Sequence, residues 1–354
     1  MKTIILTGGG TAGHVTPNLA LIPRLQADGW TVHYIGAANS PEQELIARVP
    51  GVIFHTVSVG KLRRYFDLKN FSDPFRVLRG VRQATGIIRR IKPNVVFSKG
   101  GFVSVPVVYG AKLNGVPVVT HESDMTPGLA NKLCMPFAQV QCCTFPEAVK
   151  HCKGKGVHTG SPIRPEILSG RREDGLKRFG FHDYRPVLMV VGGSSGAQAI
   201  NECVREALPQ LTQSFQVLHL CGKGNYVGEL EGTPNYTQVE YLNEEMADAY
   251  ACADVLISRA GANALCEILA LRKPALLIPY PLSASRGDQV MNAESFRERK
   301  LSRVLMQEDM TPETLVKNIE EVYRDRGQLF EAMAAEPTGN GIDSVLEQIY
   351  KYAK

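Results

Sequence analysis

Residues 258–289 read SRAGANALCEILALRKPALLIPYPLSASRGDQ, and this stretch decides the fold. Its apolar periodicity and its glycine and proline positions predict a strand ending near Ser258, a glycine loop, a helix from about Asn263, a strand over 275–278 and, after a polar loop, a second helix. The stretch is therefore a βαβα unit. Because both loops follow parallel strands, we expect them to meet at the carboxyl edge of the sheet, where open α/β folds bind ligands.

The side chains at these two loops are those that a nucleotide sugar requires. Asn263 is expected to cap the first helix, whose free backbone N–H groups and positive dipole end suit a phosphate. Glu267 follows one turn later, where a carboxylate accepts two hydrogen bonds from a ribose diol, and Asp288 and Gln289 suit further hydroxyls or an amide. Glu267 alone also fits a solvated helix position and Asp288 alone a helix cap. Their order along the unit favours the site.

The composition is that of an ordinary globular protein of about two domains. The 354 residues are 44% hydrophobic and 21% charged, and the net charge of +5 excludes no class of partner. No uninterrupted apolar run reaches the length of a membrane-spanning helix, so we expect a cytosolic protein or one peripheral to a membrane. The eight cysteines include no C-x-x-C pair, so reduced thiols are expected and a structural zinc site is not.

A second glycine loop lies near the start of the chain. Residues 2–7 form a short apolar run that ends in GGGTAGH over 8–14, and an amphipathic helical pattern follows. The loop matches G-x-G-x-x-G through Gly8, Gly10 and Gly13, which makes a dinucleotide-dependent oxidoreductase an alternative. In that class an acidic residue after the second strand binds the adenosine ribose, whereas residues 36–39 contain no carboxylate.

The two halves of the chain repeat one pattern. GGSSGA over 192–197 follows an apolar run as GGGTAGH does, and SKGG over 98–101 parallels SRAG over 258–261. The pattern predicts an α/β fold with two Rossmann-like, doubly wound domains, over 1–162 and 163–340, facing each other across a cleft. Residues 341–354 are expected to form a helix that docks back on the first domain through an apolar stripe.

Taken in order, these motifs resemble glycosyltransferase family 28, whose members have the GT-B fold. The set comprises GGGTAGH at 8–14, KGGFVS at 99–104, His121 with Glu122, GGSSGA at 192–197, RAGA at 259–262 with Glu267, and Asp288 with Gln289. The resemblance covers essentially the whole chain. It implies an inverting transfer of N-acetylglucosamine from UDP-N-acetylglucosamine to a lipid-linked muramyl acceptor, lipid I, in peptidoglycan synthesis at the cytoplasmic face of the cell membrane.

The resemblance also implies roles for individual residues. It places the donor sugar and phosphates at Thr11, Ala12 and Gly13, the diphosphate at Arg164 and Ser194, uracil near Leu242, the ribose at Glu267 and the sugar hydroxyls at Gln289. Ala262, Asp288 and Asp124 complete the predicted donor site. Two positions depart from the family pattern, Ala12 where many members have glycine and Asp124 where some have asparagine. The second departure puts an amide contact from that position in doubt.

Sugar transfer needs a base for the attacking hydroxyl and stabilisation of the departing diphosphate. His14 is the leading candidate for the base, because it titrates near neutral pH and a helix amino terminus favours its neutral form. Glu122, just past a predicted strand, is the alternative base. Helix amino ends after Gly193 and Gly261, with Arg164, are expected to stabilise the diphosphate. No metal or other cofactor is expected, because the chain lacks an Asp-x-Asp motif and members of the family it resembles invert without a metal.

Other functions remain open on the sequence alone. Within the same fold, the alternatives are a glycolipid glycosyltransferase and a UDP-N-acetylglucosamine epimerase, which would change the donor sugar with no acceptor present. From another class, the chain could be a non-catalytic nucleotide-binding protein or membrane scaffold. Titration with UDP-sugars, followed by a turnover assay with a lipid-linked acceptor, separates the three.

Residues 61–92 form a basic and aromatic segment. Only Asp67 and Asp73 oppose its basic residues, which are Lys61, Arg63, Arg64, Lys69, Arg76, Arg79, Arg82, Arg89, Arg90 and Lys92. If the segment is helical, Phe71, Phe75 and Leu78 fall on one stripe. Because aromatics beside cations suit an anionic bilayer surface, we expect the segment to dock the protein on the cytoplasmic leaflet. The plain alternative is that the aromatics are core. Nucleic acid is not expected, since no recognised binding motif accompanies the charge.

Overall fold

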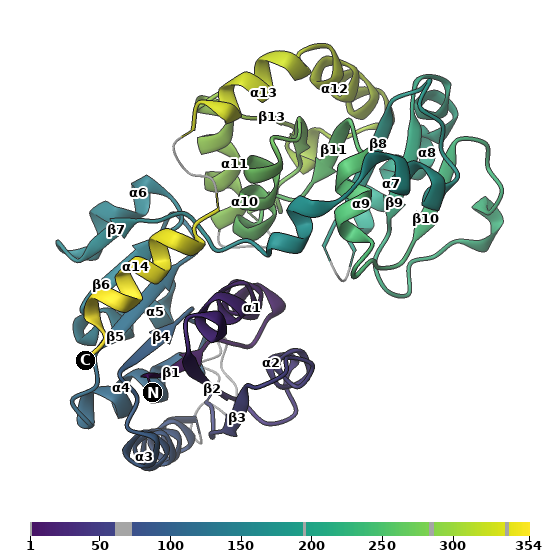
Figure 1. Ribbon diagram of the computed structural model, residues 1–354. Coiled ribbons are helices and arrows are strands. Elements are labelled where there is room, and N and C mark those ends of the chain that lie inside the picture. Colours follow the sequence, from purple (N-terminus) through teal and green to yellow (C-terminus); the bar gives the residue numbers. More distant parts are fainter. Residues whose placement is uncertain (1, 61–72, 194–195, 283–286, 337–339) are drawn as a thin grey trace. The chain divides into compact units, whose positions relative to one another are not determined.

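The computed structural model describes residues 2–60, 73–193, 196–282, 287–336 and 340–354 (Figure 1). The chain forms two compact units, Met1–Arg164 together with Asn340–Lys354, and Pro165–Gly339. Each unit has its own parallel sheet, which gives the α/β architecture that the sequence predicts. The first unit ends two residues beyond the expected boundary at 162, and the C-terminal segment belongs to the first unit.

Within the described residues, the first unit has a seven-stranded parallel sheet of order β3-β2-β1-β4-β5-β6-β7. The strands are β1 (Lys2–Thr7), β2 (Trp30–Gly36), β3 (Ile53–Thr56), β4 (Val95–Ser98), β5 (Val118–Glu122), β6 (Val140–Cys143) and β7 (Gly156–His158). The helices are α1 (Ala12–Ala27), α2 (Pro41–Ile46), α3 (Asp73–Ile91), α4 (Ser104–Leu113), α5 (Leu129–Cys134), η2 (Met135–Phe137), α6 (Pro146–Val149), η3 (Lys150–Cys152) and α14 (Ile342–Tyr352). The strand order reverses between β1 and β4, which places the ligand crevice at their carboxyl ends.

The apolar pattern of β1 explains why helices cover both faces of this sheet. Successive strand residues point to opposite faces, and every residue from Ile4 to Leu6 is apolar and fully buried. Ile4 and Leu6 belong to a core that also contains residues of α1 and α14. Ile5 belongs to a second core that contains residues of α3 and α4. A strand that buries both of its faces is the pattern of a central strand in a doubly wound sheet.

The C-terminal helix completes the first unit, although it follows the second unit in the chain. Figure 1 shows α14, in yellow, beside β4, β5 and β6. Val345 and Ile349, on the stripe expected to be a docking face, are fully buried in the core of the first unit. Trp30 stacks on Tyr350 with ring centroids 5.5 Å apart, and the Tyr350 hydroxyl donates to Asp28 Oδ2 at 2.6 Å.

The second unit repeats this topology with a parallel sheet of order β10-β9-β8-β11-β12-β13 among its described residues. The strands are β8 (Val187–Val191), β9 (Gln216–Leu220), β10 (Tyr236–Val239), β11 (Val255–Ser258), β12 (Ala275–Leu277) and β13 (Arg303–Val304). The helices are η4 (Pro165–Ser169), α7 (Arg172–Phe179), α8 (Gln198–Ser214), η5 (Gly228–Leu230), α9 (Met246–Cys252), α10 (Ala262–Leu271), α11 (Asp288–Glu298), η6 (Gln307–Asp309), α12 (Pro312–Arg324) and α13 (Arg326–Ala334). The order reverses between β8 and β11, so the two units have equivalent switch points.

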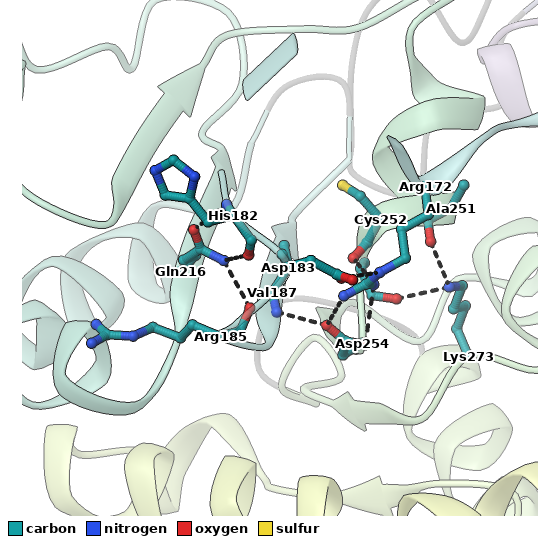
Figure 2. A network of polar contacts seen from close by, with 11 residues as sticks. Arg172, His182, Asp183, Arg185, Val187, Gln216, Ala251, Cys252, Asp254 and Lys273 are labelled. Atoms are coloured by element: carbon teal, nitrogen blue, oxygen red, sulfur yellow. Dashed lines mark hydrogen bonds and ion pairs between the residues drawn. The ribbon is translucent and has the colours of Figure 1, made fainter. Parts of the chain in front are cut away.

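A network of charged and amide side chains closes the amino edge of the second sheet (Figure 2). Arg172 of α7 donates to both carboxylate oxygens of Asp254, at 3.2 and 3.3 Å, and Asp254 also accepts from the Val187 N–H at 2.8 Å. Gln216 makes three hydrogen bonds of 2.7 Å to the backbone of segment 182–185. These bonds tie α7 and its following loop to the starts of β8, β9 and β11. The network is structural, and the opposite edge of the sheet carries the predicted site.

The described part of the basic segment is the helix α3. It buries Ala84, Ile87 and Ile88 against the sheet but leaves Phe75 76% and Leu78 61% exposed. The predicted stripe residue Phe71 lies outside the described residues. In the described part of the chain, no helix combines the length and the apolar character needed to cross a bilayer.

Candidate functional site

The predicted site residues gather at one sheet edge in each unit. In the first unit, the glycine loop after β1 and the loops after β4 and β5 lie at the carboxyl edge beside the switch point. In the second unit, the loops after β8, β11 and β12 occupy the equivalent edge. Each edge is described below by itself.

A buried carboxylate holds the glycine loop of the first unit. Glu42, on α2, is 1% exposed, and it accepts hydrogen bonds from the N–H groups of Gly10 at 3.2 Å and Ala37 at 3.1 Å. A side chain on Gly9 would collide with this carboxylate, and one on Gly101, with φ at +80°, would collide with the carbonyl oxygen of Gly9. Only glycine allows such an approach of two loops. The acid lies beyond residues 36–39 and accepts backbone N–H groups, so it does not serve as the ribose ligand of a dinucleotide fold.

His14 lies in the first turn of α1 and is hydrogen-bonded to Thr11. Its Nδ1 lies 2.9 Å from Thr11 Oγ1, and its backbone N–H donates to the Thr11 carbonyl at 3.1 Å. In the tautomer in which Nδ1–H donates to the hydroxyl, Nε2 keeps a lone pair that can take a proton. Burial, and after it the charge of Lys99, lowers the pKa of His14 to about 4, although the Glu42 carboxylate opposes the shift. His14 is therefore a neutral imidazole near pH 7.

A buried lysine gives this edge a positive charge. Lys99, directly after β4, is 1% exposed, and its ammonium donates to the Ser123 hydroxyl. Burial and then the Lys99 charge lower the pKa of His121, whose Nε2 lies 3.0 Å from the carbonyl oxygen of Gly160. A buried cation close to the start of a helix suits an anionic group of a substrate.

Glu122, the alternative base, accepts hydrogen bonds from the segment that follows β5. One of its carboxylate oxygens accepts from the Asp124 N–H at 3.1 Å. The other accepts from the Gly128 N–H at 3.0 Å and from the Asn131 side chain at 2.8 Å. These bonds favour Glu122 as the organiser of loop 123–128, and they hold the backbone of Asp124 in that loop. The side chain of Glu122 is buried, and its role as a base stays a prediction.

In the second unit, a buried arginine joins the loops after β11 and β12. Arg259 Nη1 donates to the carbonyl oxygens of Ile278 and of the following proline, at 3.1 and 3.2 Å. Its guanidinium lies 4.1 Å from the centre of the Tyr280 ring. The Tyr280 N–H in turn donates to Gln289 Oε1 at 3.2 Å, and a Cβ on Gly261 would lie 4.0 Å from Gln289 Nε2. The predicted sugar-binding Gln289 is thus fixed next to the start of α10.

The predicted ribose ligand is held by a tyrosine from another helix. The hydroxyl of Tyr250, a buried residue of α9, donates to Glu267 Oε2 at 3.0 Å. This contact leaves the carboxylate on the side of α10 that faces α9. The expectation that Asn263 caps α10 was wrong, because the extended Gly261 is the cap residue and Asn263 is already the second helical residue. The cap residue Gly261 has no side chain that could accept a hydrogen bond from the first N–H groups of this helix.

The other predicted residues lie at or near these two edges. Ala12 and Gly13 begin α1, while Ala262 and Asp288 begin α10 and α11. Arg164 ends the first chain segment of the first unit, and Leu242 is buried in the loop between β10 and α9. Ser194 lies outside the described residues.

Sequence reasoning assigned no role to four side chains that shape the two edges, namely Glu42, Lys99, Tyr250 and Arg259. Lys99 and Arg259 each follow an apolar strand directly, which was the available signal for a charge held at a carboxyl edge. Glu42 and Tyr250 gave no comparable signal. Each reaches its partner through a contact between separate helices or loops.

The chain has two Rossmann-like units with glycine loops at equivalent switch points. One loop lies beside the neutral imidazole of His14, and the other unit holds the Glu267 carboxylate and the Gln289 amide at its edge. This arrangement defines the class of GT-B glycosyltransferases. Residues 4–141 match the N-terminal domain of glycosyltransferase family 28, and residues 187–349 match its C-terminal domain. The chain belongs to glycosyltransferase family 28, as the motifs predicted. It is a glycosyltransferase, which removes the oxidoreductase alternative.

Relatives and solved structures extend the match over the whole chain. A Clostridium botulinum protein named UDP-N-acetylglucosamine--N-acetylmuramyl-(pentapeptide) pyrophosphoryl-undecaprenol N-acetylglucosamine transferase is 52% identical over 355 residues, covering 100% of both chains. The crystal structure of MurG from Acinetobacter baumannii is 26% identical, with a TM-score of 0.79 over 99% of this chain and 100% of that one. A putative UDP-N-acetylglucosamine 2-epimerase from Listeria monocytogenes is 11% identical with a TM-score of 0.71, over 100% of this chain and 98% of that one, and shows the fold alone.

Proposed function

We propose that the protein transfers N-acetylglucosamine from UDP-N-acetylglucosamine to the muramyl sugar of undecaprenyl-diphospho-muramoylpentapeptide, with inversion at the anomeric carbon. The observation that carries the proposal is the 52% identity, over the full length of both chains, to a relative that is named for this transfer. The arrangement of the two edges supplies the chemistry that the reaction needs.

The second unit is proposed to bind the donor. Glu267, oriented by Tyr250, would accept both ribose hydroxyls, and Gln289, positioned by the Tyr280 N–H, would bind sugar hydroxyls. The first N–H groups of α10, whose cap residue is a glycine, suit the diphosphate of the nucleotide. Because this stabilisation uses backbone dipoles, the reaction is proposed to need no metal.

The first unit is proposed to bind the acceptor and supply the base. The acceptor hydroxyl attacks the anomeric carbon, a new C–O bond forms, the C–O bond to the diphosphate breaks, and UDP leaves. His14 Nε2 takes the proton of the attacking hydroxyl, and Thr11 holds the imidazole through Nδ1. The buried Lys99 charge favours an anionic acceptor at this edge.

One experiment separates this function from its alternatives. Purified protein is incubated with UDP-N-acetylglucosamine, with and without the lipid-linked muramyl acceptor, and products are separated by chromatography. A disaccharide lipid and UDP, formed only with the acceptor, support the proposal. A changed donor sugar without acceptor would indicate an epimerase, and donor binding without turnover would indicate a binding protein or scaffold.

The membrane surface is the proposed place of this reaction. On α3 the exposed side chains of Phe75 and Leu78 stand beside those of Arg79 and Arg82, which fall on the same side of the helix at spacings of three and four residues. Apolar side chains that insert and cations that attract anionic lipids together give peripheral binding, with about 1 kcal/mol for each nearby Lys or Arg.

Vesicle binding tests the docking surface. Replacing Phe75 and Leu78 by serine should abolish sedimentation with vesicles that contain anionic lipid, while affinity for UDP-N-acetylglucosamine stays unchanged. Tyr184→Ser is the matched control, because Tyr184 is also 76% exposed but lies in the second unit. Full vesicle binding by the folded double variant would exclude this face of α3 as the docking surface.

A further inference from the structure

The first unit contains a concave site whose described lining residues lie outside the glycine loop. A cavity of about 550 Å³ is bounded by the loop after β5, by α5 and η2, and by the segment from η3 to β7. Its volume lies in the range of sites that bind small molecules or short peptides. Thr126 and Pro127 line it from the carboxyl side of the sheet, and Lys155 lines it from the chain segment that leads into β7. The cavity therefore extends along the β6 and β7 side of the unit.

The charge of this cavity has one sign. Lys132, Lys153 and Lys155 are among its described lining residues, and those lining residues include no aspartate or glutamate. Lys155 is fixed, since its ammonium donates to the carbonyl oxygens of Ala138 at 2.7 Å and of the proline two residues before it at 3.3 Å. Lys132 and Lys153 are exposed at the rim.

The base of the cavity is apolar. The buried side chains of Met135 and Cys152 line it together with Pro127. A rim of ammonium groups over an apolar base suits a ligand that carries carboxylates on a partly apolar chain, such as a peptide.

The backbone at Lys153 is in the left-handed conformation. Lys153 has φ at +49°, and Gly154, which follows it, has φ at +81°. The left-handed conformation costs a residue with a side chain about 1 kcal/mol, whereas glycine adopts it freely. A lysine at this position therefore places a cation at the rim at some cost in local conformational energy.

We propose that this cavity binds the peptide of the acceptor, with carboxylate groups of the peptide paired to Lys132 and Lys153. The inference rests on the proposed function, because the peptide is known here only from the name of the relative, which specifies a muramyl pentapeptide. A pentapeptide ends in a carboxylate, the group that pairs with an ammonium.

Two acceptors distinguish the peptide from the rest of the lipid. The double variant Lys132→Gln with Lys153→Gly is assayed with the complete lipid-linked acceptor and with a lipid-diphosphate muramyl acceptor that lacks the peptide. We expect its KM for the complete acceptor to rise about tenfold, as the loss of charge-assisted hydrogen bonds predicts. The KM for the peptide-free acceptor and for UDP-N-acetylglucosamine should not change. Lys112→Gln, at an exposed lysine of α4, is the control.

Stability and direct binding complete the test. Lys153→Gly should melt at or above the temperature of the parent, because glycine relieves the left-handed strain. Weaker binding of the acceptor by this variant could therefore not be ascribed to unfolding. Free muramyl pentapeptide, without lipid or diphosphate, should bind the parent more tightly than the double variant in a calorimetric titration at low salt. Equal losses for both acceptors would assign the lysines to the diphosphate and overturn the proposal, as would unchanged kinetics.

The binding arm also separates this proposal from the proposed function. If the parent transfers no sugar to any lipid-linked muramyl acceptor, the proposed function fails. The titration with free muramyl pentapeptide then still decides the cavity, because equal binding by the parent and the double variant would exclude it.

Discussion

The protonation of His14 gives the sharpest test of the mechanism. With its pKa lowered to about 4, less than about 1% of the free protein carries the imidazolium at pH 6.5, whereas an ordinary histidine would be about half protonated. A group with a lowered pKa loses its neutral form only as the pH falls through that value. The value of kcat/KM, which reports the free protein, should therefore stay level from pH 8 down to about pH 5.

Replacing Lys99 by methionine tests the cause of the shift. The charge of Lys99 is the second contribution to the lowering, after burial, so its removal should raise the pKa of His14 without restoring 6.5. Glu42→Gln removes the opposing charge and should lower the pKa further. The two variants should thus move the acid limb of kcat/KM in opposite directions, and Lys112→Met, at an exposed lysine, should leave it in place.

Two measurements follow the same proton. NMR titration of the His14 ring gives the pKa directly, and the pH profile of kcat/KM shows whether that group controls the reaction. An anionic diphosphate bound at this edge would raise the pKa of His14, so the acid limb of kcat should lie at higher pH than that of kcat/KM. A wild-type kcat/KM that falls with an apparent pKa near 6.5 would refute the reasoning. The reasoning would also be refuted if a variant shifted the pKa of His14 measured by NMR while the acid limb of kcat/KM stayed in place, since another group would then be the base.

Three further predictions concern the second unit and the donor. Tyr250→Phe should weaken UDP binding about three- to tenfold and reduce the preference for UDP over 2′-deoxy-UDP, because Glu267 loses its orienting hydrogen bond. The control is Tyr236→Phe, since the Tyr236 hydroxyl lies 2.9 Å from a histidine ring nitrogen elsewhere in the unit. An unchanged preference in Tyr250→Phe would contradict the role of Tyr250 in orienting Glu267. Asp254→Asn should lower the free energy of unfolding by about 2 kcal/mol in urea, with an unchanged m-value and normal UDP affinity, because it weakens a paired guanidinium and a backbone N–H bond at the amino edge. Dialysis against EDTA should leave the rate of transfer intact, and a loss that Mg²⁺ restores would count against a reaction without metal.

The sequence by itself determined the order of the elements, the class of fold and the sheet edges that carry the predicted site residues. Strand periodicity and glycine positions are local signals, and parallel connections bring the carboxyl ends of all strands in a sheet to one edge. For this reason Gly8, Gly261 and Gln289 could be assigned to sheet edges before any contact was known. Family membership followed from the order of the same motifs.

Only the tertiary structure decided which side chains meet at those edges. Glu42 accepts a hydrogen bond from the glycine loop, Tyr250 donates one to Glu267, and Glu122 accepts bonds from the loop that follows it. No local sequence pattern specifies the partners in these bonds. The helix α10 begins before Asn263, at Ala262, because Gly261 takes the cap position. The C-terminal helix packs on strands more than two hundred residues earlier, because burial of Val345 and Ile349 depends on a complementary apolar face and not on sequence distance.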